Sequence, residues 1–542
     1  MTTLSFEAAG AAGAAVDAKV PELVGDEVAS RLVAQDPTLW GPDAEAEASI
    51  RLGWLNPGES SRPLVGQIAA LREELAAESV TRVVLAGMGG SSLAPEVITR
   101  SAGVDLTVLD STDPDVVAAA LGDRLAETVI VVSSKSGSTV ETDSQRRVFE
   151  QAFTDAGIDA KSRIVVVTDP GSPLDAAARE AGYRAVFNAD PNVGGRYSAL
   201  TAFGLVPSGL AGADIESLLD DAELTAEMLR DDAPDNIGLQ LGAALGGTEP
   251  LRNKIVIVDE ASGLAGFPDW AEQLIAESTG KLGTGLLPVA VEPGAPEITS
   301  GAGDVLTVRI VPVDSEIIPE GDQVVVSGSL GSSMMLWEFA TAVAGRLLNI
   351  NPFDQPDVEA AKKAARGLLD ATPEPTEPSF VDGSVEVRGP ADLLGTAHTL
   401  RGALAALLRH LGPDGYLSIQ AYLDRFRQAG LADIRPELAA ATGRPVTFGW
   451  GPRFLHSTGQ FHKGGPAQGV YLQITGKPGE DVTIPDRPFT FGELISAQAA
   501  GDATVLADQG RPVLRLHLLN RDEGVREIAN VVRALATDGS GD

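Results

Sequence analysis

The chain has 542 residues, too many for one simple core, and its 44% hydrophobic content is typical of a globular protein with several folded units. The formal net charge of −35 argues against nucleic acid or an anionic membrane as a partner. The absence of cysteine excludes disulfides and cysteine-ligated metals, and the lack of a long apolar run or a secretory leader pattern predicts a cytoplasmic protein.

The first part of the chain changes its pattern near residue 80. Residues 1–79 are rich in alanine and are expected to form a helical segment. Between 80 and 230, short β-branched runs alternate with helical stretches, which predicts a doubly wound, mostly parallel sheet in an α/β domain. The expected strands are Val83–Ala86, Leu106–Leu109, Thr128–Val132 and Arg163–Val167, and the expected helices lie near Leu93–Arg100, Asp115–Leu121, Thr139–Ala156 and Pro173–Ala181.

The same alternation returns in residues 231–371 and predicts a second domain of the same architecture. The Pro/Glu-rich stretch Thr372–Ser379 predicts a linker over residues 372–383, and residues 384–542 are expected to form an additional C-terminal α/β portion. Strands are expected at Ile255–Val258, Leu286–Val291, Val305–Val311, Val324–Val326, Ser384–Val387, Tyr416–Ile419, Val446–Trp450, Val470–Ile474 and Val513–Leu519, and helices near Trp270–Glu277, Ser333–Leu348 and Asp357–Leu369.

Two turns in the first domain follow predicted strands and open predicted helices. The glycines of Gly87–Ser92 let the backbone approach a ligand, but a dinucleotide fingerprint would need glycine where Ser92 stands, so nucleotide binding is only an alternative. Ser133–Thr139 places five hydroxyls and Lys135 at one helix start. An ordinary helix cap needs one hydroxyl, whereas this density suits a phosphate dianion.

Three later motifs carry charged side chains. Arg196 follows two glycines, and its permanent, forked charge suits a developing oxyanion. Gln273 and Glu277 are four residues apart on one helix face, and Glu277 is either a general base or a solvated residue near the helix end. The segment Phe353–Lys362 has the pattern of a capped helix start with acids in its first turn.

In this order, the segments GMGGSSL, SSKSGST, VGGRYS, QLIAESTGK and NPFDQPDVEAAK resemble the motifs of the glucose-6-phosphate isomerase family, which is built from paired SIS (sugar isomerase) domains. The resemblance covers about Thr81–Arg366, and the C-terminal part resembles that of isomerases fused to transaldolase. It implies an aldose–ketose isomerase that interconverts glucose 6-phosphate and fructose 6-phosphate through an enediolate, a step of glycolysis and gluconeogenesis. It also implies no cofactor, no metal, a small-molecule sugar phosphate as partner, and a homodimer.

The resemblance assigns a role to each matched residue. Glu277 matches the base that moves a proton between C2 and C1, and Arg196 matches the arginine that stabilises the enediolate. Lys362 matches the lysine that acts with a histidine at the ring oxygen. The residues that match positions bordering the substrate or holding its phosphate are Gly90, Ser91, Ser134, Lys135, Ser136, Thr139 and Gln273.

The ring-opening histidine is where the sequence departs from the family pattern. No histidine lies between Glu277 and Lys362, where the family carries it, so ring opening is assigned to His456 or His462, with neither preferred. Two other functions stay open. One is a dual-specificity isomerase that also accepts mannose 6-phosphate. The other is a non-catalytic phosphosugar-binding protein of SIS type, which would need neither Arg196 nor Glu277.

Overall fold

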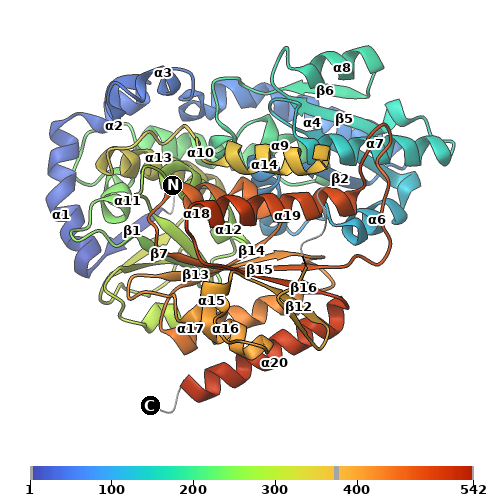
Figure 1. Ribbon diagram of the computed structural model, residues 1–542. Helices are drawn as coiled ribbons and strands as arrows, with labels where there is room; N and C mark the ends of the chain where they lie inside the picture. Colours follow the sequence, from blue (N-terminus) through green and yellow to red (C-terminus); the bar gives the residue numbers. More distant parts are fainter. Residues whose placement is uncertain (1–3, 372–376, 540–542) are drawn as a thin grey trace.

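The protein is an α/β molecule in which the described residues, 4–371 and 377–539 of a computed structural model, form three sheets covered by helices (Figure 1). The first sheet has the order β3-β2-β4-β5-β6 and is parallel throughout. Its strands are β2 (Arg82–Gly87), β3 (Thr107–Leu109), β4 (Thr128–Ser133), β5 (Ile164–Thr168) and β6 (Ala185–Asn188). Its helices are α5 (Leu93–Ala102), α6 (Pro114–Gly122), α7 (Val140–Asp155), α8 (Pro173–Ala181) and α9 (Ala202–Ala211).

Helices cover both faces of this sheet, which explains its unbroken apolar strands. All residues of β2, β4 and β5 are buried. Alternate residues enter two hydrophobic clusters, so that Val83 and Leu85 face one layer of helices while Val84 and Ala86 face the other. The parallel, helix-covered arrangement confirms the predicted doubly wound fold.

The second sheet has the order β1-β10-β9-β7-β8. Its strands are β1 (Ser5–Ala8), β7 (Lys254–Asp259), β8 (Leu287–Val291), β9 (Val305–Ile310) and β10 (Gln323–Ser327). Four strands are parallel, and β1 joins the edge in antiparallel pairing. The N-terminal segment is therefore helical except for β1, a strand too short and too polar on one face to stand out in a helix-like region.

Helices of the N-terminal segment and of the second unit surround these two sheets (Figure 1). Those of the N-terminal segment are α1 (Gly10–Gly25), α2 (Val28–Val33), α3 (Glu45–Ala48) and α4 (Pro57–Ala77). The others are α10 (Ile215–Met228), α11 (Ile237–Gly246), α12 (Phe267–Thr279), α13 (Leu330–Leu347) and α14 (Val358–Ala371). Among the described residues, none of the helices is both long and apolar enough to cross a bilayer.

The third sheet has the order β11-β12-β16-β15-β13-β14 and belongs to the C-terminal part. Its strands are β11 (Phe380–Asp382), β12 (Val385–Arg388), β13 (Tyr416–Tyr422), β14 (Val446–Trp450), β15 (Gly469–Gly476) and β16 (Val513–Leu518). The expected linker, 372–383, is thus partly wrong, because Phe380–Asp382 pairs with β12 as a hairpin. Residues 372–376 of that stretch lie outside the described residues.

The two faces of the third sheet differ in chemistry. Leu417, Ile419 and other apolar residues face the helices α15 (Ala391–Leu394), α16 (Leu400–Leu408), α17 (Ile434–Thr442) and α20 (Arg521–Gly539), at the bottom of Figure 1. Ser418 and Gln420 are also buried but lie on the opposite face by strand alternation. That face looks toward the first two sheets, together with α18 (Gly459–Gly464) and α19 (Phe491–Asp508), and α19 packs along α14 (Figure 1).

Candidate active site

A cavity of about 820 Å³, the substrate cavity below, lies where the turns after β2 and β4 face α12. The carboxyl ends of parallel strands are the usual place for a ligand in such sheets. Among the residues expected at the site, the cavity brings together Gly90, Ser91, Ser134, Lys135, Ser136, Thr139, Arg196, Gln273, Glu277 and His456. These residues come from four separate motifs and from the C-terminal part.

The carboxylate of Glu277 receives two side-chain donors in this cavity. Arg196 Nη1 lies 3.4 Å from Glu277 Oε2, and the two side chains are only 4% and 7% exposed. Gln273 Nε2 donates to the same oxygen over 3.3 Å, as expected from one face of α12. The buried Gln273 Oε1 has no partner among the described protein atoms and can accept a hydrogen bond from a sugar hydroxyl. The site thus joins a carboxylate to a fixed positive charge.

The guanidinium of Arg196 is held by the loop that precedes α14. Its Nη2 donates to the carbonyl oxygen of Asp354 over 2.7 Å, and its Nη1 donates to Gln355 Oε1 over 2.9 Å. Pro352 supplies a further carbonyl, 3.2 Å from Nη2. The segment NPFDQPDVEAAK therefore does more than start a helix, because its backbone carbonyls fix the arginine that faces Glu277.

Lys281 holds the same loop from the other side. Its Nζ donates to the carbonyl oxygens of Asn351 and Asp354, each over 2.7 Å, and forms an ion pair of 2.6 Å with Asp354 Oδ1. Burial, reinforced by the nearby Arg196, lowers the pKa of Lys281 to about 8. The ammonium thus uses all three donors on one loop.

The structure separates the two candidate histidines. His456 lines the substrate cavity, where its Nε2 lies 3.0 Å from Glu141 Oε1 and its backbone carbonyl accepts from Gln273 Nε2 over 2.8 Å. His462 is buried in α18 outside this cavity, with Nδ1 3.0 Å from the Tyr416 hydroxyl. Burial lowers the pKa of His462 to about 3. Of these two histidines, His456 is the one that lines the cavity containing Glu277.

The hydroxyl-rich turn after β4 forms a compact cradle at the start of α7. Ser134 Oγ donates to Thr139 Oγ1 over 3.1 Å and accepts from the Gly137 N–H over 3.2 Å. Gly137 has a φ of +70°, and a Cβ there would stand 2.5 Å from the Cβ of Leu174, so glycine is required. No side chain caps α7, which leaves its first N–H groups for an anion.

The glycine turn after β2 lies directly against two other motifs. A Cβ on Gly90 would stand 1.9 Å from the carbonyl oxygen of Gly195, and one on Gly89 would stand 2.8 Å from Gln273 Nε2. Glycine therefore lets the backbones beside Arg196 and Gln273 close the floor of the cavity. The close packing of these backbones is by itself enough to require glycine at positions 89 and 90.

Several site features could not be read from the sequence, and one expected residue cannot be placed. Lys362 lies within α14, but its side chain is outside the described part of the structure, so its role stays a prediction. Glu141 accepts from Gln498 Nε2 over 2.7 Å besides facing His456. In the sequence, Glu141 has the pattern of an ordinary first-turn acid. Gln355 and Gln498 carry no local signal at all.

The paired parallel sheets and the hydroxyl cradle beside the Glu277–Arg196 pair define a protein of the SIS, or sugar isomerase, type. A family model described as phosphoglucose isomerase matches residues 68–284. Glucose-6-phosphate isomerase of Synechococcus elongatus is 30% identical over 396 residues, 61% of this chain and 74% of that protein. The probable glucose-6-phosphate isomerase of Haloarcula marismortui is 31% identical, over 53% of this chain and 78% of that protein. The chain belongs to the phosphoglucose isomerase family.

The chain matches only part of the length of its relatives. The chain spans 66% of the length of the Cyanothece glucose-6-phosphate isomerase, at 30% identity. Among solved structures, a hypothetical protein of Thermus thermophilus matches with a TM-score of 0.56 and 26% identity, over 66% of this chain and 97% of that one. A glucose-6-phosphate isomerase of Chlamydia trachomatis has a TM-score of 0.51 at 21% identity, over 65% and 79%, which supports the fold alone.

Proposed function

We propose that this protein interconverts glucose 6-phosphate and fructose 6-phosphate by moving a proton between C2 and C1. The observation that carries the proposal is the buried Glu277–Arg196 pair, 3.4 Å apart, in the same cavity as the hydroxyl cradle. A carboxylate can serve as the base, and a guanidinium can offset the negative charge that the base creates. A protein that only binds phosphosugars would need neither.

In this proposal the substrate phosphate binds at the start of α7. Ser134, Ser136 and Thr139 supply hydroxyls, and the uncapped helix start supplies backbone N–H groups. Lys135 forms an ion pair of 2.7 Å with Asp169, so its ammonium is held at the rim of the cradle. These local donors allow an anion to bind to a chain whose net charge is strongly negative.

Ring opening is assigned to His456. The bond between C1 and O5 breaks as the hydroxyl at C1 loses its proton and O5 gains one, and His456 mediates this exchange. Glu141, 3.0 Å from His456 Nε2, orients the imidazole ring. Lys362 is expected to assist at the ring oxygen, as the resemblance implies.

Isomerisation then proceeds on the open chain. Glu277 removes the proton from C2 and the enediolate forms, with Arg196 next to the new negative charge. The hydroxyl proton passes from O2 to O1, and Glu277 returns its proton to C1. Gln273 holds the carboxylate of Glu277 and accepts from a substrate hydroxyl through its free carbonyl oxygen.

Conversion of glucose 6-phosphate in D₂O tests the proposal, with the products followed by NMR. We expect fructose 6-phosphate with deuterium at C1, because a proton held by Glu277 exchanges with solvent. Saturable binding without conversion would instead establish a non-catalytic protein. Mannose 6-phosphate, the C2 epimer, is assayed in parallel, and its conversion would establish the dual specificity that the sequence left open.

The proposal also includes a homodimer and a cytoplasmic location. Both follow from the resemblance and the composition. Light scattering on the purified protein should give twice the chain mass of 56.0 kDa. A mass of 56.0 kDa would contradict the dimer, and His456 would still reach the cavity of its own chain.

A further inference from the structure

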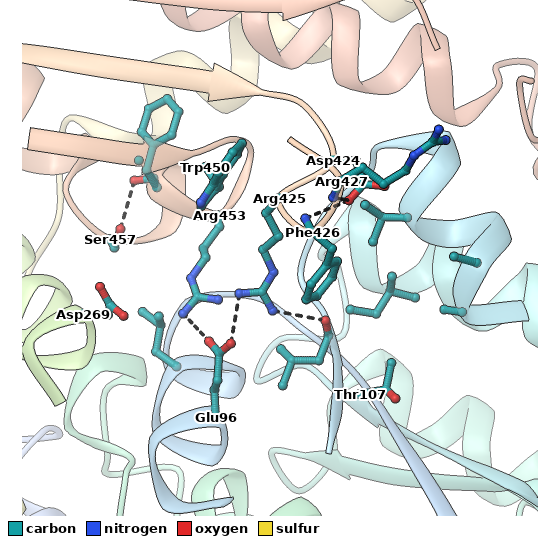
Figure 2. A pocket seen from close by; sticks show the side chains of 18 of the residues that line it. Glu96, Thr107, Asp269, Asp424, Arg425, Phe426, Arg427, Trp450, Arg453 and Ser457 are labelled. Carbon is teal, nitrogen blue, oxygen red and sulfur yellow. Dashed lines mark hydrogen bonds and ion pairs between the residues drawn. The ribbon is translucent and has the colours of Figure 1, made fainter. Parts of the chain in front are cut away.

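A second cavity, of about 1220 Å³ and called the interdomain cavity here, lies between the first and third sheets (Figure 2). Its floor is the polar face of β13 and β14, with Ser418, Gln420 and Thr447. Its opposite wall is formed by α5, β3 and α6. The mechanism above uses none of these floor residues, although the cavity is larger than the substrate cavity.

Two buried side chains on this floor have free hydrogen-bonding groups. Gln420 is 1% exposed, and neither its amide nitrogen nor its carbonyl oxygen has a partner among the described protein atoms. Thr447 is 4% exposed, and its hydroxyl is equally unpartnered. Buried polar groups are rarely left unpaired, because each unmade bond costs about 1–3 kcal/mol. These groups are therefore placed to bind a ligand that both donates and accepts.

The charges of the cavity argue against an anionic ligand. Figure 2 shows Arg425 and Arg453 converging on the carboxylate of Glu96, with Arg425 Nη1 2.9 Å from Oε1. Arg453 Nη1 is also 2.9 Å from Asp110 Oδ2, so both guanidinium charges are already offset. Arg82, Arg100 and Arg427 also line the cavity, but among its described lining residues eight carboxyl side chains face five arginines, a balance that disfavours a phosphate.

Two carboxyl groups from α12, those of Asp269 and Glu272, also line the interdomain cavity. Asp269 lies beside Arg453 in Figure 2, and Glu272 accepts from the backbone N–H of Ala290 over 3.1 Å. Burial, with Asp269 nearby, raises the pKa of Glu272 to about 8. Burial therefore favours the protonated form of the Glu272 carboxyl, which can donate a hydrogen bond as well as accept one. An uncharged, hydroxylated ligand matches these groups.

Aromatic residues lie at the edge of the cavity. Phe448 and Trp450 meet edge to face with ring centroids 4.9 Å apart and pack against the apolar cluster on the opposite face of β14, although both also line the cavity. Phe426, 63% exposed, stands nearby with Arg425 over its ring at 4.8 Å. Apolar rings next to a few placed polar groups are typical of small-molecule sites.

We propose that the interdomain cavity binds an uncharged, polyhydroxylated ligand of the sugar class, a mono- or disaccharide without phosphate. Each sugar hydroxyl both donates and accepts, which satisfies the amide of Gln420, the hydroxyl of Thr447 and the carboxyl of Glu272. The C–H faces of the sugar pack on the exposed ring of Phe426, which also lines the cavity. Such a ligand is distinct from the phosphorylated substrate, for which the paired guanidinium groups of Arg425 and Arg453 offer no free charge.

The two cavities share their dividing walls. Along residues 453–463, Arg453, Phe454, Ser457, Thr458 and His462 line the interdomain cavity, while Leu455, His456 and Lys463 line the substrate cavity. On α12, Asp269 and Glu272 face one cavity and Gln273 and Glu277 the other. A sugar in the interdomain cavity should therefore alter the rate of isomerisation, and this step alone rests on the proposed function.

Titration of the full chain with glucose, trehalose and adenosine, by calorimetry and tryptophan fluorescence, tests the binding. Four of the five tryptophans are at most 7% exposed, all five being described, so Trp450 is the fluorophore that reports on the cavity. We expect saturable sugar binding that weakens at least about tenfold in Gln420→Leu, a loss typical of a buried hydrogen-bonding partner. Thr447→Val, which keeps the shape of the side chain, provides a second test if Gln420→Leu misfolds.

The matched control is the double variant Ser136→Ala, Thr139→Ala, which alters the substrate cavity alone. It should bind trehalose as the parent protein does, whether or not the isomerase proposal holds. No saturable sugar binding, adenosine binding alone, or equal binding in Gln420→Leu and Thr447→Val would each overturn the inference. Sugar binding without a change in isomerisation would overturn only the coupling between the cavities.

Discussion

At the scale of single residues, the site depends on what surrounds one carboxylate. Glu277 is held by Arg196 and Gln273, and Arg196 is held in turn by backbone carbonyls of the loop before α14. The sequence indicated Glu277 and Gln273 as neighbours because they lie four apart on one helix. It could not indicate the carbonyls that hold Arg196, because Arg196 and Asp354 are 158 residues apart.

Replacing Glu277 by glutamine should abolish turnover and spare binding. The amide keeps the shape of the side chain and can still accept from Arg196, but it cannot take a proton from C2. We expect kcat to fall by about 10³-fold or more, with the Kd for glucose 6-phosphate changed less than about threefold. Coupled assays and calorimetry measure the two quantities, and a variant with near-normal kcat would remove Glu277 as the base.

Replacing His456 by alanine should impair activity, whereas the same replacement of His462 should not. His456→Ala should lower kcat/KM for glucose 6-phosphate by about 10²-fold, since the cyclic substrate loses its ring-opening catalyst. Glu141→Gln should lower it less, because it removes only the partner of His456. His462→Ala is the control and should keep its kcat per folded molecule, measured after thermal unfolding has confirmed the folded fraction. The reverse order of effects would assign ring opening to His462.

At the scale of helices and strands, periodicity predicted most of the fold. Buried β-branched runs located β2, β4, β5, β7 and β9, because both faces of these strands are covered. The strands that were missed are short and lie at sheet edges. They are β1, β6 and β11, which have partly exposed patterns of three or four residues and no long apolar run. Several helices, among them α10, α19 and α20, were also not expected individually.

The start of α7 should govern substrate affinity and not the chemical step. Ser136→Ala together with Thr139→Ala removes two hydroxyls from the cradle and leaves Glu277 and Arg196 in place. We expect KM to rise by about 10- to 100-fold while kcat stays within about threefold. Ser217→Ala, at the remote start of α10, is the control that should change neither. An unchanged KM in the double variant would exclude this turn as the phosphate site.

At the scale of the whole molecule, the site is assembled from all three sheet units. The hydroxyl cradle proposed to hold the phosphate follows β4, the proposed base Glu277 lies on α12, and His456 comes from the C-terminal part. Local motifs indicated the first two, because their residues are close in the chain. The choice between His456 and His462 needed the tertiary structure, since only the packing of residues 453–463 against Glu141 and Gln273 separates them.

The loop before α14, which Lys281 and Arg196 hold in place, should make the activity depend on pH. Deprotonation of Lys281, with its pKa lowered to about 8, leaves two N–H donors for three acceptors on the loop that holds Arg196. We expect kcat/KM to fall along an alkaline limb with an apparent pKa near 8. Lys281→Arg, which stays charged, should remove that limb. A limb unchanged in this variant would assign it to another group.

Unfolding does not account for that limb. Because the pKa of Lys281 is about 8 in the folded protein and 10.5 ordinarily, the unfolded chain binds more protons between these values. The contribution of Lys281 to stability therefore rises with pH in this window. Thermal unfolding measured across the same range should show no parallel loss.

The order of the site residues along the chain has a consequence for biosynthesis. A ribosome emits the cradle after β4 and then Glu277 well before His456. Domains fold as they emerge, so under the proposed function a nascent chain has its phosphate site before it has its ring-opening histidine. The growing polypeptide should therefore bind a sugar phosphate before it can convert one, and conversion should begin only after the last sheet has closed against the first two.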